Sequence, residues 1–553
     1  MCKKLKFVMK NHANVILSQI DIINRRELLA TATAMGASIS SAYASLGLTV
    51  PTASEVKPKR GGTARIQQSI IGLKDPRTWD WPQIANFARG WLEYLVEYQN
   101  DGTLRGMLLE RWTVNEDATE FILTLRDNIF WNTGEKLGAA HIRWLFEYWC
   151  DNSVPNNSMA SRLDSLVDPN TNTLIIDSVI LLDSRNLLIR PRYPDITIIS
   201  SLADYPAAVV HPKGIYSETE FSSIGTGPYK PDYFAEGERA VLVRNDKHEW
   251  WGYSTEGFSG AYLDKIEFID TGTDPYNYIK AIELGQIDML YQNTGIFIDI
   301  ADSLGWAKYS TNSSATLVLR QKHDTTIEGL RPFSNTSIRQ AFQLAIKNEV
   351  CLELGYDNIG DVAENHHICP IHPEYAEIEP TVFDPQKAQK LLYQSEAREL
   401  EFTLHTLDDE FNRNTGAAAV AQLKDAGFKI KQIIVPEKTY RQNWSKYDFS
   451  VTEWNHRALG IQIMSLAYRS NQPWNETGYS NEDFDNLVDQ ALGIIDITER
   501  KLLMAKIEKI MLRDAVIIQP FWRHLYRHTH PNLIGAEIHP TLEIHLYKLG
   551  WKE

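Results

Sequence analysis

Short runs of β-branched and apolar residues, bounded by polar turns, occur early in the chain and predict strands over residues 120–125, 173–176 and 186–190. Later in the chain, apolar residues recur three and four positions apart, as expected for helices with one buried face. A helix of this kind that ends at Gly427 leads into a β-branched run over residues 429–435. Because helices and strands alternate in this way, the pattern favours a mixed α/β fold with several domains.

Capping residues mark the starts of the later helices. Ser337, Ser480 and Asp384 precede amphipathic runs, and each is a predicted N-cap whose side-chain oxygen can accept a backbone N–H. The helix that follows Ser337 is expected to stop at Gly355, since glycine commonly closes helices. Two more helices are predicted over residues 415–424 and 498–513.

The composition is that of an ordinary globular protein. Of the 553 residues, 43% are hydrophobic and 23% are charged, which excludes disordered, collagen-like and small disulfide-dense chains. This length predicts about two to four domains. The 15 tryptophans and 24 tyrosines would suit an aromatic-lined ligand site, although core packing is the ordinary role of such rings.

The net charge is unevenly distributed. The chain carries a formal charge of −15, but its first 44 residues contain six basic and two acidic residues, a net charge of +4, so the remainder carries −19. A body this acidic repels phosphate backbones, so we expect no nucleic-acid partner.

The N-terminal segment has the features of an export signal. Arg25 and Arg26 precede an uncharged stretch over residues 30–41, and residues 42–44 form an A-x-A cleavage site. The arginine pair, followed by one residue and two leucines, resembles a twin-arginine signal. An ordinary secretory signal is the alternative.

We therefore predict an export signal at residues 1–44, a mature chain that starts near Ser45, and a flexible leader at residues 45–60. The uncharged stretch is shorter than the roughly twenty residues that span a membrane, and no later segment is long and apolar enough. Cys2 lies before the signal rather than behind a lipid-attachment motif. These features predict a soluble protein of the bacterial periplasm.

Three cysteines lie beyond the signal. Cys150 ends a helical run over residues 140–149 and is expected to be a buried, unreactive thiol. Cys351 and Cys369 are close enough in sequence for a disulfide in an oxidising compartment. Geometry decides such a bond, so free thiols are an equal alternative.

Seven short motifs occur in a fixed order, and the most characteristic is the run Gly-Thr-Gly-Pro-Tyr-Lys. The motifs lie at residues 225–230, 243–245, 250–252, 266–269, 281–288, 338–346 and 479–485. Each is weak alone, but the ordered set resembles the family 5 extracellular solute-binding proteins of ABC importers, which include oligopeptide, dipeptide and nickel binders. The resemblance covers about residues 61–550.

The glycine-rich run has a structural interpretation of its own. Gly225 and Gly227 permit backbone angles that other residues resist, and Pro228 stiffens the exit, so we expect a tight corner. A phosphate-binding loop is a poor alternative, because no Lys-Ser or Lys-Thr pair follows at the P-loop spacing.

The resemblance implies an α/β, two-lobed periplasmic binding protein of the class II type with an additional inserted subdomain. One lobe is assembled from separate pieces of the chain and the other is contiguous, with the ligand buried between them. Closure by hinge motion would be the working step. Carried onto this chain, lobe 1 takes residues 61–99, 211–299 and 515–553, the inserted subdomain residues 100–210, and lobe 2 residues 300–514.

In peptide-binding relatives, a W-x-x-D loop supplies an aspartate that holds the ammonium group of the peptide. The matching stretch here is Trp454-Asn455-His456-Arg457, so an arginine replaces that aspartate. A guanidinium suits a carboxylate or phosphate and repels a free amino terminus, which argues against an ordinary dipeptide. The alternative is that Arg457 pairs with a nearby acidic residue and braces the loop.

Six further residues are candidate cleft residues from their positions relative to the family motifs, with core packing an equal alternative for the aromatic ones. They are Trp79, Trp81, Tyr291, Gln292, Tyr468 and Arg469.

His366, His367, Cys369 and His372 are residue types that bind zinc, copper or nickel. Closely spaced histidines in a proline-flanked loop are also often simply solvated. We therefore expect no bound metal here, and no cofactor elsewhere.

The resemblance implies a periplasmic binding protein that captures a peptide or peptide-like small polar solute, performs no chemistry, and delivers the solute to an inner-membrane ABC permease and ATPase complex. We expect it to act as a monomer. One alternative is a secreted hydrolase of the glycosidase type, although the chain has no G-x-S-x-G or H-E-x-x-H motif. Another is a sensor that binds a ligand without transporting it.

Overall fold

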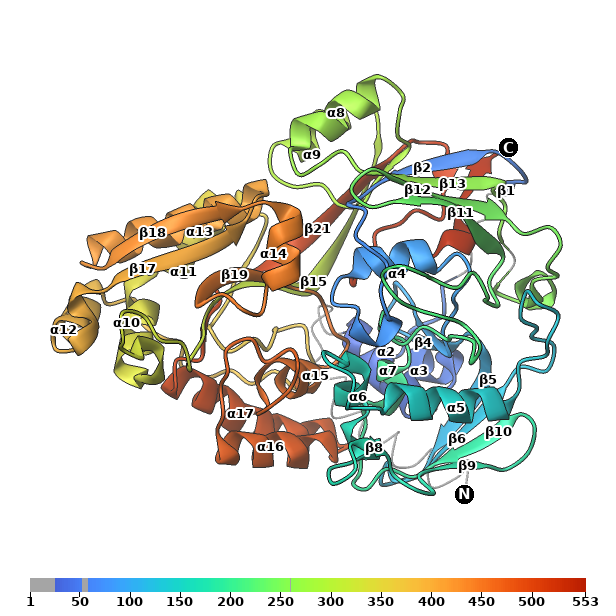
Figure 1. Ribbon diagram of the computed structural model, residues 1–553, viewed down its shortest axis with the longest axis horizontal. Helices are drawn as coiled ribbons and strands as arrows, with labels where there is room; N and C mark the ends of the chain where they lie inside the picture. The colour runs from blue at the N-terminus through green and yellow to red at the C-terminus, as the bar shows by residue number, and fades with distance from the viewer. Residues whose placement is uncertain (1–24, 52–57, 259) are drawn as a thin grey trace.

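The computed structural model describes residues 25–51, 58–258 and 260–553. Figure 1 shows two bodies joined by the long strands β15 (Ala307–Gln321) and β21 (Phe521–Thr529). Helices and strands alternate along the chain in both bodies, which confirms the mixed α/β fold predicted from the sequence. We keep the names lobe 1, inserted subdomain and lobe 2 for the residue ranges predicted above, and those limits stay a prediction.

One sheet runs through both lobes. Within the described residues it contains ten strands in succession, and the short strands β16 (Gly360–Val362) and β20 (Ile517–Ile518) pair with β21 and β15. The spatial order is β11-β12-β13-β2-β14-β21-β15-β19-β17-β18. The strands not yet given bounds are β11 (Tyr229–Ala235), β12 (Arg239–Arg244), β13 (Lys265–Ile269), β2 (Thr63–Gln67), β14 (Met289–Leu290), β19 (Phe449–Trp454), β17 (Glu401–Leu407) and β18 (Lys429–Val435).

The pairing of β15 with β21 carries the sheet from one lobe to the other. The two strands run antiparallel, from Ala307 opposite Thr529 to Thr316 opposite Trp522. The second half of β15 pairs with β19 instead, and Thr316 also lies opposite Trp454. Since β19 ends at Trp454, this register sets where the predicted ligand loop begins.

Phenylalanine rings form the core of lobe 2. The Phe342 ring of α10 (Thr336–Ala345) lies 4.4 Å from Phe428, 5.1 Å from Phe402 and 5.4 Å from Phe449, measured between centroids. Burial of these rings holds the helices on the sheet. The other helices of this lobe are α11 (Asn348–Tyr356), α12 (Pro385–Tyr393), α13 (Glu410–Asp425), α14 (Glu437–Asn443), α15 (Gly460–Ile463), α16 (Glu482–Leu492) and α17 (Ile497–Arg513).

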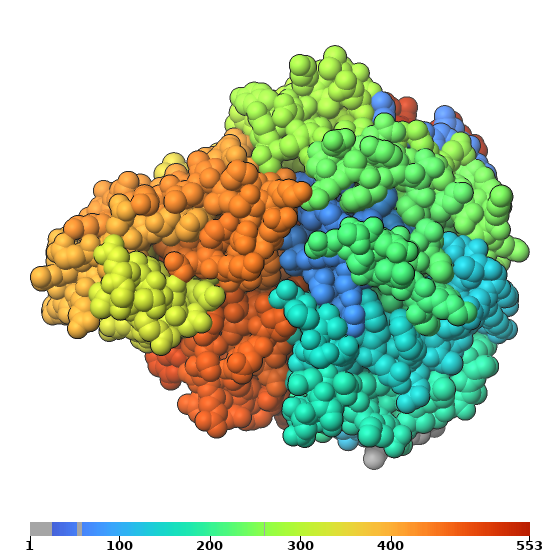
Figure 2. Space-filling model, in the orientation of Figure 1, coloured from blue at the N-terminus to red at the C-terminus, as the bar shows by residue number. Residues whose placement is uncertain are grey.

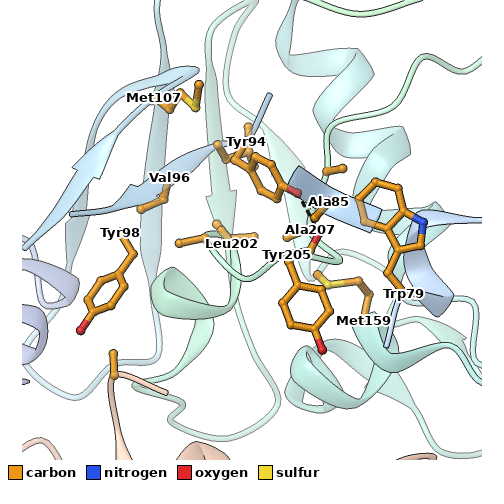
Figure 3. Packing of buried hydrophobic residues seen from close by; sticks show 14 of the residues in the cluster. Trp79, Ala85, Tyr94, Val96, Tyr98, Met107, Met159, Leu202, Tyr205 and Ala207 are labelled. Carbon is orange, nitrogen blue, oxygen red and sulfur yellow. Dashed lines mark hydrogen bonds between the residues drawn. The ribbon is translucent and has the colours of Figure 1, made fainter. Parts of the chain in front are cut away.

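The inserted subdomain has an antiparallel sheet of its own in the order β5-β6-β10-β9, and α5 (Ala139–Trp149) packs against it. Figure 3 shows part of the adjoining core, where the Tyr94 hydroxyl donates to the carbonyl oxygen of Tyr205 at 2.8 Å and Trp79 lies close by. The strands and short helices here are β5 (Leu109–Val114), β6 (Phe121–Leu125), β7 (Val167–Asp168), β8 (Thr173–Leu174), β9 (Val179–Leu181), β10 (Asn186–Ile189), α6 (Ser158–Arg162) and α7 (Ile198–Ser201).

The rest of lobe 1 covers the ends of the large sheet. Its strands β1, β22 and β23 form a small antiparallel sheet, and β3 pairs with β4 beside the inserted subdomain. The elements of this part are α4 (Pro82–Ala88), α8 (Pro275–Glu283), α9 (Phe297–Ser303), β1 (Pro58–Lys59), β3 (Val96–Tyr98), β22 (Leu533–Ile534) and β23 (Gly550–Lys552). The partner of β3, β4 (Leu104–Gly106), falls within the range of the inserted subdomain.

Two helices near the start of the chain, α2 (Arg25–Ala34) and α3 (Ile39–Ser45), pack against this body. The Arg26 guanidinium donates to the carbonyl oxygen of Asn312 at 2.6 Å. Glu27 is buried, which raises the pKa of its carboxyl to about 8. The segment therefore contacts the strand that links the two lobes.

The predicted export signal and leader are described only in part, because residues 1–24 and 52–57 lie outside the described residues. Removal of the segment before Ser45 stays a prediction. No helix of the described chain is both long and apolar enough to cross a membrane.

The predicted strands at residues 120–125, 186–190 and 429–435 are confirmed as β6, β10 and β18. The strand predicted at 173–176 is present only as the shorter β8. The helices α13 and α17 confirm the two later helices, and the Asp384 side chain caps α12 as expected.

Three details of the helix predictions are wrong. Asn335 caps α10 in place of Ser337, and Asn481 caps α16 in place of Ser480. Asparagine and serine are equally good N-caps, so the local sequence did not separate these neighbours. Gly355 does not end α10 but lies inside α11. Glycine is required at this position because a Cβ would overlap Thr415 of α13.

Cys150, Cys351 and Cys369 are all free and buried. Cys351 lies in the aromatic core of lobe 2, whereas Cys369 belongs to a separate apolar cluster with Trp522. The disulfide alternative is therefore wrong. Burial raises the pKa of the Cys351 thiol to about 12 and raises the pKa of the other two thiols as well, which keeps all three unreactive.

The corner at residues 225–228 depends on close approach rather than on unusual backbone angles. A Cβ on Gly225 would overlap the carbonyl oxygen of Trp91, and the backbone N–H of Gly227 donates to that same oxygen at 3.0 Å. Neither glycine has a left-handed backbone conformation. Glycine is needed here because the chain packs directly on the Trp91 backbone.

We expect Gly225→Ala to lower the free energy of unfolding by roughly 1–3 kcal/mol, since the added methyl group forces the backbone apart. Urea unfolding followed by fluorescence measures the change. Gly72→Ala is the matched control, because its Cβ would meet only the carboxylate of Glu236 at ordinary contact distance. Equal stability of Gly225→Ala and the control would contradict the packing argument.

Glu508 on α17 is buried beside other carboxyl groups, and burial, with a smaller contribution from Glu364 and Glu374, raises its pKa to about 9. The unfolded chain loses this proton near pH 4.3, so between about pH 5 and pH 9 it holds fewer protons than the folded protein. The free energy of unfolding should therefore fall as the pH rises through this range.

Glu508→Gln should flatten that fall, because the amide does not ionise. Unfolding curves at several pH values test this, with the exposed Glu499→Gln on the same helix as control. An unchanged slope in Glu508→Gln would show that Glu508 does not titrate as described.

Candidate functional site

A groove of about 830 Å³ lies between lobe 1 and lobe 2. Figure 2 shows it as the hollow where orange residues of lobe 2 face blue and green residues of lobe 1. Its volume suits a small organic solute. Lobe 1 contributes residues 71–74, 78, 80 and 81 and the loop at 217–221, and lobe 2 contributes residues 441, 442, 444–446, 473 and 474.

The groove continues into a narrow inner pocket of about 20 Å³ that includes the predicted ligand loop. Trp81, Trp444 and Trp474 line both spaces. The inner pocket is lined by Asp80, Trp81, Tyr205, Trp444, Thr452, Glu453, Trp454, Asn455, Arg457 and Trp474.

Trp454 is held in place by a buried carboxylate. Glu476 accepts hydrogen bonds from Trp454 Nε1 at 2.9 Å, Thr452 Oγ1 at 2.8 Å and Arg320 Nε at 2.8 Å. All four side chains are buried. A carboxylate with three donors and a buried guanidinium partner fixes its neighbours firmly, so the Trp454 ring has one orientation at the end of β19.

Arg457 lines the inner pocket and also pairs with an acidic residue. Its Nε lies 3.3 Å from Asp204 Oδ2, and its guanidinium carbon lies 5.6 Å from the Tyr205 ring and 5.8 Å from the Trp474 ring. Asp204 is shared with Arg162, whose Nε lies 2.7 Å away. The pair with Asp204 is the acidic contact expected in the alternative interpretation, and a ligand-binding role of Arg457 stays a prediction.

The two residues between Trp454 and Arg457 point in different directions. Asn455 lines the inner pocket, whereas His456 is fully buried outside it. His456 Nδ1 accepts the backbone N–H of Ser314, and its Nε2 shares a hydrogen bond with the Tyr98 hydroxyl at 3.1 Å. Burial holds the pKa of His456 well below its usual range, so the ring is neutral.

The two tryptophans singled out in lobe 1 have different environments. Trp81 lines the groove, while Trp79 is fully buried and donates from Nε1 to the carbonyl oxygen of Lys74 at 2.8 Å. The Trp79 ring also stacks on Phe221 at 6.4 Å between centroids. Trp79 is a core residue, whereas Trp81 faces the cleft.

Tyr291 and Gln292 do not line the cleft and instead brace the crossing strands. Arg523 donates from Nη2 to Gln292 Oε1 at 2.6 Å, and Arg527 donates from Nε to the carbonyl oxygen of Tyr291 at 3.1 Å. Both arginines belong to β21 and are buried.

Tyr468 and Arg469 also lie away from the groove. The Tyr468 hydroxyl is 2.6 Å from His367 Nδ1 in the interior of lobe 2. Arg469 reaches Asp164 of the inserted subdomain at 2.9 Å and Asp489 of α16 at 2.8 Å. Arg469 therefore joins lobe 2 to the inserted subdomain.

Sequence reasoning missed several residues of the inner pocket, namely Asp80, Tyr205, Trp444 and Trp474. Asp80 Oδ2 accepts from Trp444 Nε1 at 3.1 Å, across the two lobes. Asp80 lies between Trp79 and Trp81 in the sequence, so it could have been predicted as a cleft residue together with them. The others are aromatic residues with no motif around them.

The histidines at 366–372 do not converge on one point. His366 Nε2 lies 3.0 Å from Glu364, and His372 Nδ1 accepts the backbone N–H of Cys369 at 3.2 Å. All three histidines are buried, so the expectation of a solvated loop is wrong. Their partners lie in different directions, and this geometry offers no shared metal position.

Two other groups of histidine and glutamate lie close enough to hold a metal ion, and their hydrogen bonds argue against it. In the first, His141 and His211 each accept a backbone N–H at Nδ1 and approach Glu135 with Nε2 at 3.2 Å. Each Nε2 must then carry the hydrogen, and it has no lone pair for a metal.

The second group is His539, Glu543 and His545. His539 Nδ1 accepts the backbone N–H of Thr541, and its Nε2 donates to the carbonyl oxygen of Tyr98 at 3.1 Å. With both ring nitrogens of His539 engaged, this group lacks the three free ligand atoms that a zinc site needs.

The family model described as bacterial extracellular solute-binding proteins, family 5 Middle, matches residues 103–475, more than half of the chain. The chain belongs to this family. Family 5 proteins are non-enzymatic transport components, so the chain is the substrate-binding protein of an ABC importer and the hydrolase alternative is set aside.

Individual relatives are distant from this family 5 chain. It is 26% identical over 310 residues to the nickel-binding periplasmic protein of Escherichia coli K12, an alignment that spans 54% of each protein, or about half of the relative's length. It is 19% identical over 578 residues to the dipeptide-binding protein DppE of Bacillus subtilis, covering 92% of this chain and 96% of that protein. Among solved structures, OppA of Haemophilus influenzae in complex with RPPGFSPFR has a TM-score of 0.79 at 19% identity, covering 90% and 100% of the two chains.

Proposed function

We propose that this protein works in the periplasm, where it captures a peptide or peptide-like small polar solute between its lobes and delivers it to an inner-membrane permease. The observation that carries the proposal is the groove between the lobes, which narrows into a pocket lined by aromatic rings together with polar and charged side chains. The names of two relatives, a nickel-binding periplasmic protein and a dipeptide-binding protein, support the location and the ligand class.

Export by the twin-arginine route is part of the proposal and rests on the arginine pair before an uncharged segment. The proposed domain limits are supported by the crossing strands, since β15 begins at Ala307 and β21 at Phe521, near the proposed ends of lobe 2.

Closure of the lobes would be the working step, and side chains already meet across the interface. Trp444 of lobe 2 donates to Asp80 of lobe 1, and Gln462 Nε2 donates to Ser200 Oγ of the inserted subdomain at 3.0 Å. These contacts describe a closed arrangement, and a ligand that adds contacts on both sides would stabilise it further.

Protein purified from the periplasm should carry a small molecule that is released on unfolding. Native mass spectrometry before and after mild denaturation measures the mass difference, and the expected result is one solute per chain that is absent after unfolding. A bare chain that also binds no member of a peptide, peptide-conjugate and metal-chelate panel in a thermal-shift assay would contradict the proposal.

Transport and sensing are separated by a second measurement on the same ligand. Uptake of the labelled solute should be lost in cells that lack this protein. Normal uptake in those cells would favour the sensor alternative.

Arg469 provides a test of closure away from the groove. Arg469→Gln removes an ion pair between lobe 2 and the inserted subdomain and should weaken ligand binding by about 1–3 kcal/mol by favouring the open form. Calorimetry measures the affinity, and small-angle X-ray scattering measures the expected increase in radius of gyration. The preference among ligands should not change.

Arg192→Gln is the matched control for this variant. Arg192 binds the same Asp164 oxygen at 2.8 Å but belongs to the inserted subdomain, so its loss leaves the lobes joined. If both variants weaken binding equally, then the effect arises from Asp164 itself and not from closure.

A further inference from the structure

We infer that the cleft takes a solute that presents an oxyanion, a carboxylate or phosphate, at the inner pocket and no ammonium group there. The inference rests on the proposed function, because it concerns the ligand of the same cleft. Its basis is that the buried polar atoms lining the cleft without hydrogen-bond partners are all donors.

Three side chains supply these donors. Trp81 Nε1 and Arg441 Nη1 are buried and, among the described residues, have no hydrogen-bond partner. Arg457 Nε is also buried and makes no aligned hydrogen bond, although it lies 3.3 Å from Asp204 Oδ2 in an ion pair. Trp81 lines both the groove and the inner pocket, Arg441 lines the groove, and Arg457 lines the inner pocket. Their side chains are at most 9% exposed. Nearly all buried polar groups in proteins find a partner, and an N–H group needs an acceptor.

The two carboxylates that line the inner pocket already have partners. Asp80 accepts from Lys74 at 2.9 Å through one oxygen and from Trp444 at 3.1 Å through the other. Glu453 is paired with the buried guanidinium of Arg523. The remaining acidic residues of the groove lie on its exposed rim, so no buried carboxylate is left to hold an ammonium group.

The charge balance of the inner pocket favours an anion as well. Arg162 and Arg457 both converge on Asp204, so two guanidinium groups share one carboxylate and leave a net charge of +1. Both arginines are buried, the Asp204 side chain is only 10% exposed, and the guanidinium of Arg162 lies 4.4 Å from the centre of the Trp474 ring. An unbalanced charge in such a poorly solvated place is stabilised by a counter-charge on the ligand.

Arg457 and Trp81 would then act together on the oxyanion. The guanidinium provides charge and the indole N–H provides a neutral hydrogen bond, the combination that binds carboxylates and phosphates tightly. The tryptophan rings around them would contact the apolar part of the solute.

Three probes of defined charge test this at pH 7 by calorimetry and thermal shift: N-acetyl-alanyl-alanine, glycerol 3-phosphate and alanyl-alaninamide. At least one of the two anions should bind, and which one binds distinguishes carboxylate from phosphate. The cationic amide should not bind. Any solute that co-purifies with the protein should migrate as an anion on ion-exchange chromatography.

Variants connect this preference to the named donors. Arg457→Gln and Trp81→Phe should each weaken binding of the anionic probe about tenfold or more, as expected for hydrogen bonds to a charged group. Trp79→Phe is the matched control, because Trp79 is a core residue with its N–H already paired, and it should leave affinity unchanged.

A second readout does not depend on any ligand. In the unliganded protein, Trp79→Phe breaks a hydrogen bond and Trp81→Phe breaks none, so Trp79→Phe should lower the melting temperature more. Equal lowering would show that Trp81 Nε1 is paired, which would overturn the inference.

Binding of the cationic amide with no response to either anion, or a co-purified solute that migrates as a cation, would also overturn it while leaving the proposed function intact. Absence of any co-purified solute, together with no response to any probe, would instead contradict the proposed function, and the inference with it.

Discussion

The antiparallel pairing of β15 with β21 is the contact on which the arrangement of the two lobes depends. It carries one sheet through the whole molecule and places the end of β19, where Trp454 lies, beside the groove. Buried arginines on β21 fix this crossing on the lobe 1 side, since Arg523 and Arg527 bind Gln292 and the backbone of Tyr291.

The inner pocket depends in turn on charges supplied by distant parts of the chain. Arg162 and Asp204 come from the inserted subdomain and Arg457 from lobe 2, yet the three groups form one buried cluster. The two guanidinium groups, with an opposing contribution from burial, hold the pKa of Asp204 below its ordinary value. The cluster therefore stays ionised through the neutral range and links the inserted subdomain to the ligand loop.

The sequence was sufficient for the fold and for part of the site. Ordered motifs carried the family resemblance, and the aligned loop at Trp454 and Arg457 does line the pocket. Trp79 and Trp81 could not be separated, because the chain leaves a 3₁₀ turn at the first and enters α4 after the second, which gives them different surroundings. Trp444 and Trp474 could not be found, since their place in the pocket arises from contacts with residues several hundred positions away.

Details of the helices also could not be predicted from local sequence alone. Asn335 and Ser337 are both favourable caps, and in the structure the Asn335 side chain accepts the backbone N–H of Ser337. Gly355 looked like a stop signal in the sequence, but its role is to admit α13. Local patterns thus located the elements well, while close approaches between elements decided their details.

The three buried free thiols have a consequence for how the protein matures. None of the described cysteines is cross-linked, and burial keeps each thiol protonated. The stability of this fold therefore draws nothing from oxidation of these thiols. Folding can reach completion in a reducing cytoplasm as readily as in an oxidising compartment, so the order of folding and export is left free by the chemistry of the chain.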